Sequence, residues 1–531
     1  MMIHRRFVLA ACLFSLLFCP LLSAEEGNRP PGVIIDTSPD FPTTYVGSPT
    51  IAILPDGTYA AAHDWFGPNE KQHVTVTFVS KDKGKTWTKT AEFPFHWANL
   101  FVHKGDLYLM GVLKQRYKVT PGFSHLAIRK STDGGRTWTE PMDSKTGLLR
   151  TDAPYHSAPC PIVEHNGRLW KGFETIMSGK KRDELGFPRL WGATFEARML
   201  SVPVDADLLD AESWTVSEPF LYDFENWVGN GFLEGNAVLS PEGKIVNVLR
   251  VAAEGRDKGV ILDVSEDGKK QTSRGKASQI DFPGGAVKFT VRFDPKSKRY
   301  WSLATQQKDP MATRNYLVLI SSEDLIHWKR ETVVFRHHDW RDHAWQYIDW
   351  VFEGENNIVF VSRTAWDGAH NNHDANYMTF HRIENFRDKS SKDDSPWLGK
   401  DVMKRQENED YVIDGTFASV GVLQDGEKAF ANRDYPWSGI PKRFRGWKFV
   451  RIDGGGKEAI RLTPKQDSVV YMIGPYNKDI PGWNHLEKLR AFYKVNGKDT
   501  SVSFYERAVE KDIRTDVHQI EFVGGIIIFK E

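Results

Sequence analysis

The chain has 531 residues, enough for one large hydrophobic core or for two. Its 70 Lys and Arg balance 70 Asp and Glu, so nothing favours binding to nucleic acid or to an acidic membrane surface. Aromatic residues make up 12% of the chain and include 18 Trp, an amount that suits both a large β-sheet core and stacking against sugar rings.

The N-terminus has the features of a secretory signal peptide. Arg5 and Arg6 precede an apolar run over 7–22, and small residues end at Ala24, where we expect cleavage. The sequence therefore predicts a secreted or periplasmic protein. A lipoprotein anchor at Cys19 is the weaker alternative, because the bulky Phe18 stands where a small residue is expected.

Cysteine usage excludes two kinds of stabilisation. Cleavage of the signal peptide removes Cys12 and Cys19 and leaves Cys160 as the only cysteine. No intramolecular disulfide and no multi-cysteine zinc site can then form. Cys160 stands between two prolines, and we interpret it as a small buried apolar residue.

Between 32 and 386, short apolar or alternating runs are separated by turn signals. Pro-Asp-Gly at 55–57, His-Asn-Gly at 165–167 and Pro-Glu-Gly at 241–243 each stand between two candidate strands, as hairpin turns do. No stretch of ten or more residues has the 3.6-residue period of a helix. The pattern predicts an all-β fold.

A turn motif occurs twice and gives the length of a repeat. Ser80–Trp87 and Ser131–Trp138 share Ser, Asp, Gly, Thr and Trp at the same offsets, and their tryptophans are 51 positions apart. Weaker copies follow at 210–214 and 322–328. The motif resembles the Asp-box of sialidase-type β-propellers, whose blades are four-stranded sheets. About 50 residues per blade over this region predict seven blades, with six as the alternative.

Composition divides the chain into four parts. We expect a signal peptide over 1–24, a catalytic β-propeller over 32–386 and a charged linker over 387–410, which is dense in Lys, Asp, Ser and Glu. Strand-like runs resume over 411–531, and we interpret this part as a β-sandwich accessory domain.

Polar clusters rich in His and Arg stand at expected loop ends of the propeller. A pair of histidines facing one mouth would supply a base near neutral pH, although each one alone is more often structural. The densest cluster, over 337–376, could hold a divalent cation such as Ca²⁺ or form a hydrogen-bonded network. The candidate catalytic residues are His103, His125, Arg198 and His63. The candidate substrate-binding residues are Asn99, Tyr155, His156, Trp170, Glu234, Asn236, Arg250, Arg292, Tyr347, Arg363 and His370.

Several stretches together resemble a group of seven-bladed polysaccharide enzymes, namely ulvan lyases, rhamnose–glucuronate lyases and a family of α-L-rhamnosidases. The stretches that carry this resemblance are 45–49, 99–103, 202–209, 234–236, 346–350 and 373–381. The resemblance implies a secreted enzyme that cleaves a uronate-containing polysaccharide or oligosaccharide by β-elimination. In these lyases an Arg neutralises the carboxylate of the uronic acid, and His and Tyr act as base and acid.

The resemblance assigns roles to particular residues. His103 and His125 stand at the positions of the two histidines of the lyases. The family's Tyr falls on Trp170, which cannot transfer a proton, and its Arg falls on Glu196, with Arg198 two residues further on. In the rhamnosidase branch the matching catalytic residue is His63.

Two other readings remain open. An exo-α-sialidase needs three arginines around the substrate carboxylate, a Tyr–Glu nucleophile pair and an Asp acid. Arg250, Arg292 and Arg363 are the candidate arginines, but the early arginine of such sialidases has no counterpart between Pro30 and Lys71. A non-catalytic glycan-binding propeller is the last alternative.

Overall fold

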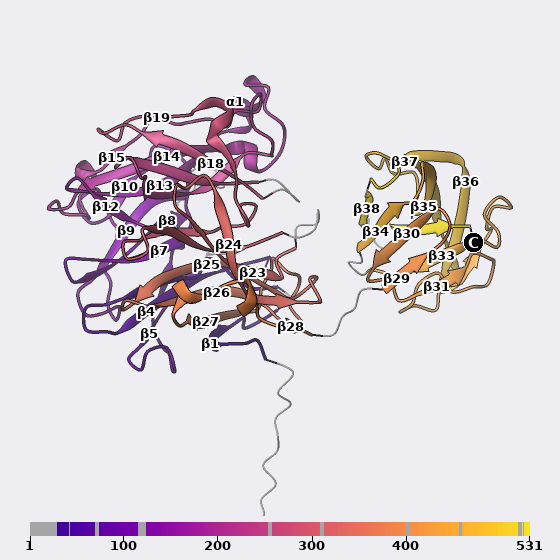
Figure 1. Cartoon of the computed structure of the whole chain (residues 1–531), viewed down its shortest axis with the longest axis horizontal. Coiled ribbons are helices and arrows are strands. Elements are labelled where there is room, and N and C mark those ends of the chain that lie inside the picture. Colours follow the sequence, from indigo (N-terminus) through magenta and orange to yellow (C-terminus); the bar gives the residue numbers. More distant parts are fainter. Residues whose placement is uncertain are drawn as a thin grey trace, which may run out of the picture.

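The computed structural model describes residues 29–530 except 42, 69–73, 115–123, 253–256, 308–312, 400–403, 456–458, 514, 519–522 and 524. Within these residues the protein is almost entirely β-structure, with one short α-helix, α1 (Gly179–Glu184) (Figure 1). The predicted all-β fold class is therefore confirmed. The predicted signal peptide and the alternative anchor at Cys19 lie outside the described residues. None of the described helices is long and apolar enough to cross a membrane.

In the described parts of 33–398, six sheets follow one another, and we number them as blades 1–6. Blade 1 contains β2 (Tyr45–Val46), β3 (Thr50–Ile53), β4 (Tyr59–Phe66), β5 (Val74–Ser80) and β6 (Thr88–Pro94). Blade 2 contains β7 (His96–His103), β8 (Asp106–Lys114), β9 (Ser124–Ser131) and β10 (Leu148–Arg150). Blade 3 contains β11 (Tyr155–His156), β12 (Val163–His165), β13 (Arg168–Ile176), β14 (Phe195–Pro203) and β15 (Thr215–Val216).

The other three blades have the same order of antiparallel strands. Blade 4 contains β16 (Phe232–Leu239), β17 (Ile245–Val251), β18 (Lys258–Val264), β19 (Gln271–Thr272) and β20 (Gln279–Asp281). Blade 5 contains β21 (Thr290–Asp294), β22 (Arg299–Thr305), β23 (Tyr316–Ser322), β24 (Trp328–His337) and the added parallel strand β28 (Trp397–Leu398). Blade 6 contains β25 (Ala344–Glu353), β26 (Asn357–Ala365), β27 (Tyr377–Ile383) and β1 (Val33–Thr37). Short 3-10 turns lie at Gly192–Thr194, Ala211–Ser213, Gly275–Ser278, Phe386–Asp388 and Ser391–Asp393.

Contacts between neighbouring sheets close the blades into a ring. Strand β3 contacts β7 of blade 2 and β25 of blade 6, β13 contacts β16, and β21 contacts both β16 and β25. Strand β1 pairs with β27, so the beginning of the chain completes the last blade. Six blades are the smaller of the two predicted numbers. Connections such as 177–194 lengthen the repeats beyond the roughly 50 residues assumed from the turn motif.

The repeated turn motif joins the third strand of a blade to its fourth. In blade 2, Ser131 Oγ accepts a hydrogen bond from Gly135 N (2.8 Å) and donates one to Asp133 (2.8 Å). Asp133 also accepts from Thr137 N (2.9 Å), and the Trp138 indole donates to Gly135 O (3.2 Å). The motif at Ser80–Trp87 joins β5 to β6 in the same way. Trp87 packs against Phe380 of blade 6 (5.5 Å between ring centres), and Trp138 packs against Phe93 of blade 1 (6.0 Å).

Three inner strands of alternate blades begin with the same irregularity. Trp97 in β7, Glu234 in β16 and Tyr347 in β25 have left-handed backbone conformations, with φ of 52°, 61° and 53°. The register of each strand shifts at this point, which is a β-bulge. A bulge redirects a side chain, and a bulky residue with positive φ is strained, so both features are typical of functional sites.

The residue two positions after each bulge holds the neighbouring blades. Asp349 accepts hydrogen bonds from Thr50 Oγ1 (2.7 Å) and Ile51 N (3.1 Å), and Thr50 Oγ1 accepts one from Leu100 N (3.0 Å). Thr50 is fully buried. One hydroxyl therefore connects blades 1, 2 and 6 beside two of the bulges. Asn99 and Asn236 stand at the equivalent position, two residues after the bulges at Trp97 and Glu234.

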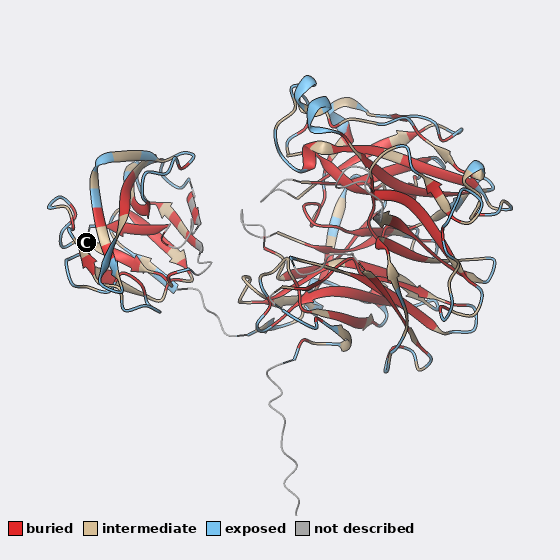
Figure 2. Cartoon of the chain, turned by 180° about the vertical axis from the view of Figure 1, so that it is seen from behind, coloured by how far each residue is buried: buried red, intermediate tan, exposed pale blue. Residues whose placement is uncertain are grey.

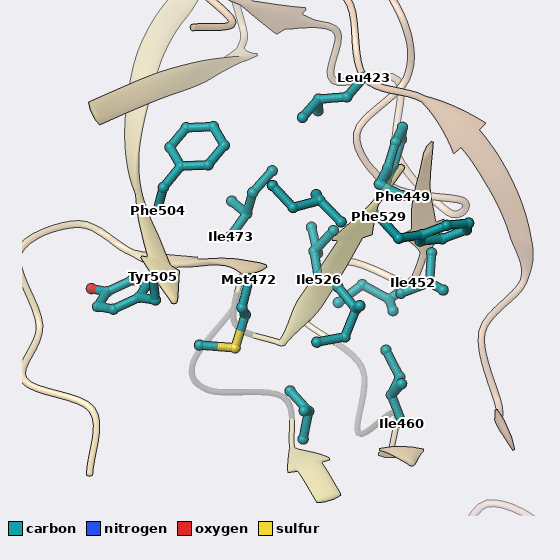
Figure 3. Close-up of a cluster of buried hydrophobic side chains, with 14 of the residues drawn as sticks. Leu423, Phe449, Ile452, Ile460, Met472, Ile473, Phe504, Tyr505, Ile526 and Phe529 are labelled. Atoms are coloured by element: carbon teal, nitrogen blue, oxygen red, sulfur yellow. The ribbon is translucent and has the colours of Figure 1, made fainter. Parts of the chain in front are cut away.

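Residues 404–530 form two further sheets. The smaller contains β29 (Lys404–Glu407), β30 (Tyr411–Gly415), β34 (Ala459–Pro464) and β38 (Thr515–His518). The larger contains β31 (Ser419–Val422), β32 (Trp437–Ser438), β33 (Lys448–Arg451), β35 (Ser468–Pro475), β36 (Asn484–Val495), β37 (Lys498–Val509) and β39 (Ile526–Phe529). Their buried side chains form one core of their own, with Met472, Ile473 and Phe504 near its centre (Figure 3).

Part of the segment expected to be a linker lies on blade 5. Arg387 forms an ion pair with Asp294 (2.6 Å), and Asp394 accepts a hydrogen bond from Val333 N (2.7 Å). These contacts hold residues 387–398 against β21 and β24. Figure 2 shows buried residues along the strands and exposed ones in the connecting loops and in the α1 region.

The node at Thr50 can be tested by the isosteric change Thr50→Val. The change leaves the buried Leu100 N without its acceptor and removes one of the donors to Asp349, so we expect a loss of about 2–4 kcal/mol in the free energy of unfolding. Urea unfolding measures it. Thr88→Val, at an exposed position of β6, is the control and is expected to change the free energy of unfolding by less than about 0.5 kcal/mol. A loss no larger than that of the control would contradict the role of this hydroxyl.

Candidate active site

The inner strand of each even-numbered blade begins at one face of the ring, and the second strand of every blade ends at the same face. We call this face mouth A. The opposite face is mouth B. The three bulged residues therefore all lie at mouth A, on blades 2, 4 and 6. Loops at the mouths of a propeller are where its ligands bind.

Tyr347, Glu234 and Arg250 lie together at mouth A. Arg250 Nη1 donates to Glu234 Oε2 (2.8 Å) and lies 3.4 Å from the Tyr347 hydroxyl. Burial favours a raised pKa for the Glu234 carboxyl, but Arg250 and a hydrogen bond from Tyr347 hold the pKa below its ordinary value. Glu234 is therefore an ionised carboxylate that shares Arg250 Nη1 with the Tyr347 hydroxyl.

Two more arginines flank Tyr347. The Arg363 guanidinium lies over the Tyr347 ring (4.7 Å) and over the Phe66 ring of blade 1 (4.4 Å). The Arg314 guanidinium lies 6.0 Å from the centre of the Tyr347 ring, and its Nη1 donates to Gln346. Burial, together with the charges of Arg250 and Arg363, lowers the pKa of Arg314 to about 10.

The loop after β26 supports these arginines. Arg363 Nε and Nη2 donate to the backbone oxygen of His373 (2.9 and 2.5 Å), and Gln346 Nε2 donates to the same oxygen (3.0 Å). Burial and the neighbouring Arg363 lower the pKa of His373 to about 3, so this imidazole is neutral at ordinary pH. His370 in the same loop stacks on Tyr45 of blade 1 (5.4 Å).

Glu174 of blade 3 anchors the Glu234 bulge from the other side. Its Oε1 accepts a hydrogen bond from Gly235 N (2.9 Å), and its Oε2 lies 2.9 Å from His156 Nδ1. Glu174 is fully buried and His156 almost so. The imidazole also contacts the ring of Trp97 at 4.4 Å between ring centres.

Asp64 is the acidic residue of blade 1 at this mouth. It lies near the end of strand β4, two residues before Phe66, and its Oδ1 accepts a hydrogen bond from Ser48 N (2.7 Å). Its charge also acts on Arg363. A carboxyl group therefore lies on the blade 1 side of the arginines.

The three arginines make this cluster a candidate site for an anion. Arg250, Arg314 and Arg363 surround one tyrosine, whereas Glu234 is the carboxylate that pairs directly with one of them. Buried like charges repel strongly unless an opposite charge joins them. A substrate carboxylate at the Tyr347 hydroxyl would supply that charge and would be held by charge-assisted hydrogen bonds.

The predicted histidine pair is not brought together, and the prediction that His103 and His125 act on one sugar is wrong. His103 pairs with Asp106 at the start of β8, whereas His125 pairs with Leu113 near its end. Seven residues of extended strand separate the two positions by about 24 Å. His103 thus lies at mouth B, where its Nε2 is 2.9 Å from Val204 O, while His125 lies at mouth A.

Three further predicted residues lie outside the cluster. His63 is enclosed between Trp65 and Phe78, with its Nε2 2.9 Å from Asp36 of blade 6, so it cannot reach a sugar. Trp170 is buried near the mouth B end of β13, and its indole donates to His165 O (3.2 Å). Arg198 donates to Thr175 Oγ1 (3.1 Å) and Ser217 O (2.7 Å) within blade 3.

Other predicted residues shape the ring. The amides of Asn99 and Asn236 are buried between inner strands, and Asn236 Oδ1 accepts a hydrogen bond from Val291 N (3.0 Å). Arg292 donates to Trp350 O (2.6 Å) and lies 3.7 Å from Asp349, deeper in the ring than the cluster. The Tyr155 hydroxyl donates to Asp152 (3.1 Å). Of the predicted residues, Glu234, Arg250, Tyr347 and Arg363 form the cluster, with His156 and His370 at its edge.

Sequence reasoning missed Arg314 and Glu174. Arg314 stands in a loop before β23, where no pattern distinguishes it from other surface arginines, and Glu174 reads as one polar residue of an alternating strand. One recognisable signal was a repeated spacing, in which an amide or carboxylate residue stands two positions after a bulky one. It occurs at Trp97 and Asn99, at Glu234 and Asn236, and at Tyr347 and Asp349.

One group in the 337–376 cluster has ligand atoms close enough for a divalent cation. Asp339, Asp342 and His343 each offer an atom, and these atoms all lie within 4.8 Å of one another. The same groups also form a hydrogen-bonded network, since His343 Nδ1 lies 3.1 Å from Asp342 and its Nε2 lies 3.1 Å from Asp367. A cation such as Ca²⁺ stays a prediction.

Asp257, immediately before β18, is another carboxyl near this mouth. Burial raises its pKa to about 7 although the backbone of Gly284 and Gln307 donates to it. Because this pKa exceeds the value of about 3.8 in an unfolded chain, the contribution of Asp257 to stability is full below about pH 4. It is lost progressively as the pH rises to about 7.

Asp257→Asn removes this titration. We expect the free energy of unfolding of the wild type to fall relative to that of Asp257→Asn by about 1.4 kcal/mol per pH unit between pH 4 and 7, and then to level off. Denaturant unfolding at several pH values measures the difference. Asp263→Asn is the control. The free energy of unfolding of the wild type relative to that of Asp263→Asn must not fall as the pH rises, because Arg274 lowers the pKa of Asp263. Parallel curves for wild type and Asp257→Asn would contradict the assignment.

Comparison with known proteins gives similarities of overall structure alone. No protein-family profile and no curated protein sequence matches the chain. Among solved structures, it is similar to a protein of unknown function from Dyadobacter fermentans, with 16% identity over 68% of this chain and 100% of that chain (TM-score 0.46). It is also similar to a GH93 α-L-arabinofuranosidase of Fusarium graminearum, with 12% identity over 67% and 98% (TM-score 0.45). The NanB sialidase of Streptococcus pneumoniae has 12% identity over 68% of this chain and 71% of its own (TM-score 0.46).

Proposed function

We propose that the protein is a glycoside hydrolase that removes an acidic sugar, with Tyr347 as the nucleophile and Glu234 as its base. The observation that carries the proposal is a buried glutamate and a tyrosine hydroxyl that both lie within hydrogen-bonding distance of Arg250 Nη1, inside a group of three arginines. These are the parts that the sialidase reading of the sequence required.

The geometry supports a double displacement. Glu234 accepts the proton of the Tyr347 hydroxyl, and the phenolate oxygen attacks the anomeric carbon of the sugar. The bond from that carbon to the leaving oxygen breaks, and Asp64 is the candidate to give this oxygen a proton. Water, deprotonated by the same acid–base group, then cleaves the tyrosyl–sugar bond, so the configuration is retained.

The arginines have a separate role in this proposal. Arg250, Arg314 and Arg363 bind the carboxylate of the sugar, and Arg250 in addition stabilises the developing phenolate 3.4 Å away. Preorganised charges of this kind lower the barrier because they need no rearrangement during the reaction. Sialic acid, which carries a carboxylate on its anomeric carbon, fits this arrangement.

Elimination from a uronate remains the second candidate, since the same arginines would neutralise a uronate carboxylate. Tyr347, rather than the separated His103 and His125, would then be the base. The two reactions differ in their products. A lyase leaves a conjugated double bond that absorbs in the near ultraviolet, whereas a hydrolase adds only a reducing end. Incubation with sialoglycans, ulvan and gum arabic, followed by both readouts, distinguishes them.

Tyr347→Phe tests the nucleophile. We expect kcat to fall by at least about 10³-fold, because the change removes the attacking oxygen while leaving the ring between the arginines. The rate of release of 4-methylumbelliferone from its sialoside measures this. Tyr155→Phe is the matched control, since the Tyr155 hydroxyl bonds to Asp152 outside the cluster. A kcat for Tyr347→Phe within tenfold of the wild type would contradict the mechanism.

Arg314→Met tests the binding of the carboxylate. The loss of one charge-assisted contact is expected to raise KM about tenfold or more, equivalent to at least ~1.4 kcal/mol. Steady-state kinetics on the same sialoside measure it. Arg299→Met, which removes a more exposed guanidinium of blade 5, is the control and should leave KM unchanged. An equal KM in both variants would show that Arg314 does not meet the substrate.

A further inference from the structure

We propose that Trp191 and Trp97, the two ends of a row of aromatic side chains on blades 2 and 3 whose middle rings are buried, form the subsite for a neutral hexose to which the acidic sugar is joined. The row consists of Trp97, His156, Phe195 and Trp191. This inference rests on the proposed function and deepens it, because it names the group that departs when the glycosidic bond breaks.

The four rings form a continuous series. The ring centres of Trp97 and His156 are 4.4 Å apart, those of His156 and Phe195 are 4.7 Å apart, and those of Phe195 and Trp191 are 4.6 Å apart. Their planes are inclined to one another at 52–79°. The series runs from the bulge at the start of β7 to the connection between β13 and β14.

The row adjoins the catalytic cluster at mouth A. Glu174 binds His156 at one carboxylate oxygen and Gly235 N at the other, so the row is tied to the residue after Glu234. The charge of His156 also contributes to the lowered pKa of Glu234. If arginines of blades 4, 5 and 6 hold the carboxylate of a substrate, the rest of that substrate can lie over blades 1–3.

Trp191 is exposed although its backbone is fixed. Trp191 is 59% exposed. It belongs to the connection between β13 and β14, which carries α1 at the rim of the ring (Figures 1 and 2). Trp191 O accepts hydrogen bonds from Thr194 N (3.1 Å) and Thr194 Oγ1 (2.7 Å). An exposed indole leaves a large apolar area in water and offers a flat surface on which a sugar ring can stack.

Trp97 gives the second and independent observation. Its left-handed backbone, with φ of 52°, is strained for a bulky residue, and strain of this kind persists where a side chain must be aimed at a ligand. The two tryptophans lie at the two ends of the row. Aromatic rings attract the apolar CH face of a hexose, whereas charged sugars are better served by the arginines across the mouth.

The experiment compares two substrates that share the acidic sugar and differ in what departs. In 3′-sialyllactose the leaving group is a neutral disaccharide, and in methyl α-sialoside it is a methoxy group with no ring to stack. For Trp191→Ala we expect kcat/KM to fall about tenfold on sialyllactose and to stay within about twofold on the methyl sialoside. Leu185→Ala, an exposed apolar residue after α1, is the matched control and should change neither value.

The outcomes separate this inference from the proposed function. Equal effects of Trp191→Ala on both substrates, or none on either, would overturn the subsite. If the wild type cleaves neither sialoside, the proposed sialidase activity fails, and calorimetric titration with lactose decides on the subsite alone. Lactose binding that weakens in Trp191→Ala and not in Leu185→Ala supports the subsite, and binding that is undetectable or unchanged overturns it. Circular dichroism shows that each variant is folded.

Discussion

The closed ring of blades is the constraint on which the rest of this protein depends. The inner strands carry buried polar groups, such as those of Thr50, Asn236 and Asp349, which find partners in the neighbouring blades. Thr50, Asn236 and Asp349 provide these partners through buried hydrogen bonds between strands that are far apart in the sequence. Breaking one bond leaves a buried group unsatisfied on another blade, which couples the blades to one another.

The same constraint produces the candidate active site. The hydrogen bonds of Asn99, Asn236 and Asp349 hold the inner strands just after the bulges, so that Trp97, Glu234 and Tyr347 stand at the start of alternate blades. Strain in these residues is sustained by the surrounding sheet. The site is therefore built on rigid strands, while the loop after β26 adds hydrogen bonds that orient the arginines.

Charge and aromaticity are distributed unequally around mouth A. Blades 4–6 contribute Arg250, Arg314 and Arg363, and blades 2 and 3 contribute the aromatic row. An acidic sugar joined to a neutral one has the same division. This match between the two halves of the mouth and the two halves of such a substrate is the physical link between the proposed hydrolase and the proposed subsite.

The sequence by itself determined the all-β class and the Asp-box turns, and it named Glu234, Arg250, Tyr347 and Arg363 among the candidate residues without showing that they meet. Those features depend on local rules, such as the φ that Gly permits or the turn amides that Asp can bind. Only the tertiary structure decided that His103 and His125 lie at opposite mouths, that His63 is enclosed, and that Arg314 and Glu174 join the cluster. Which end of a strand a residue occupies depends on register, and register is set by pairing between segments that the sequence does not show to be neighbours.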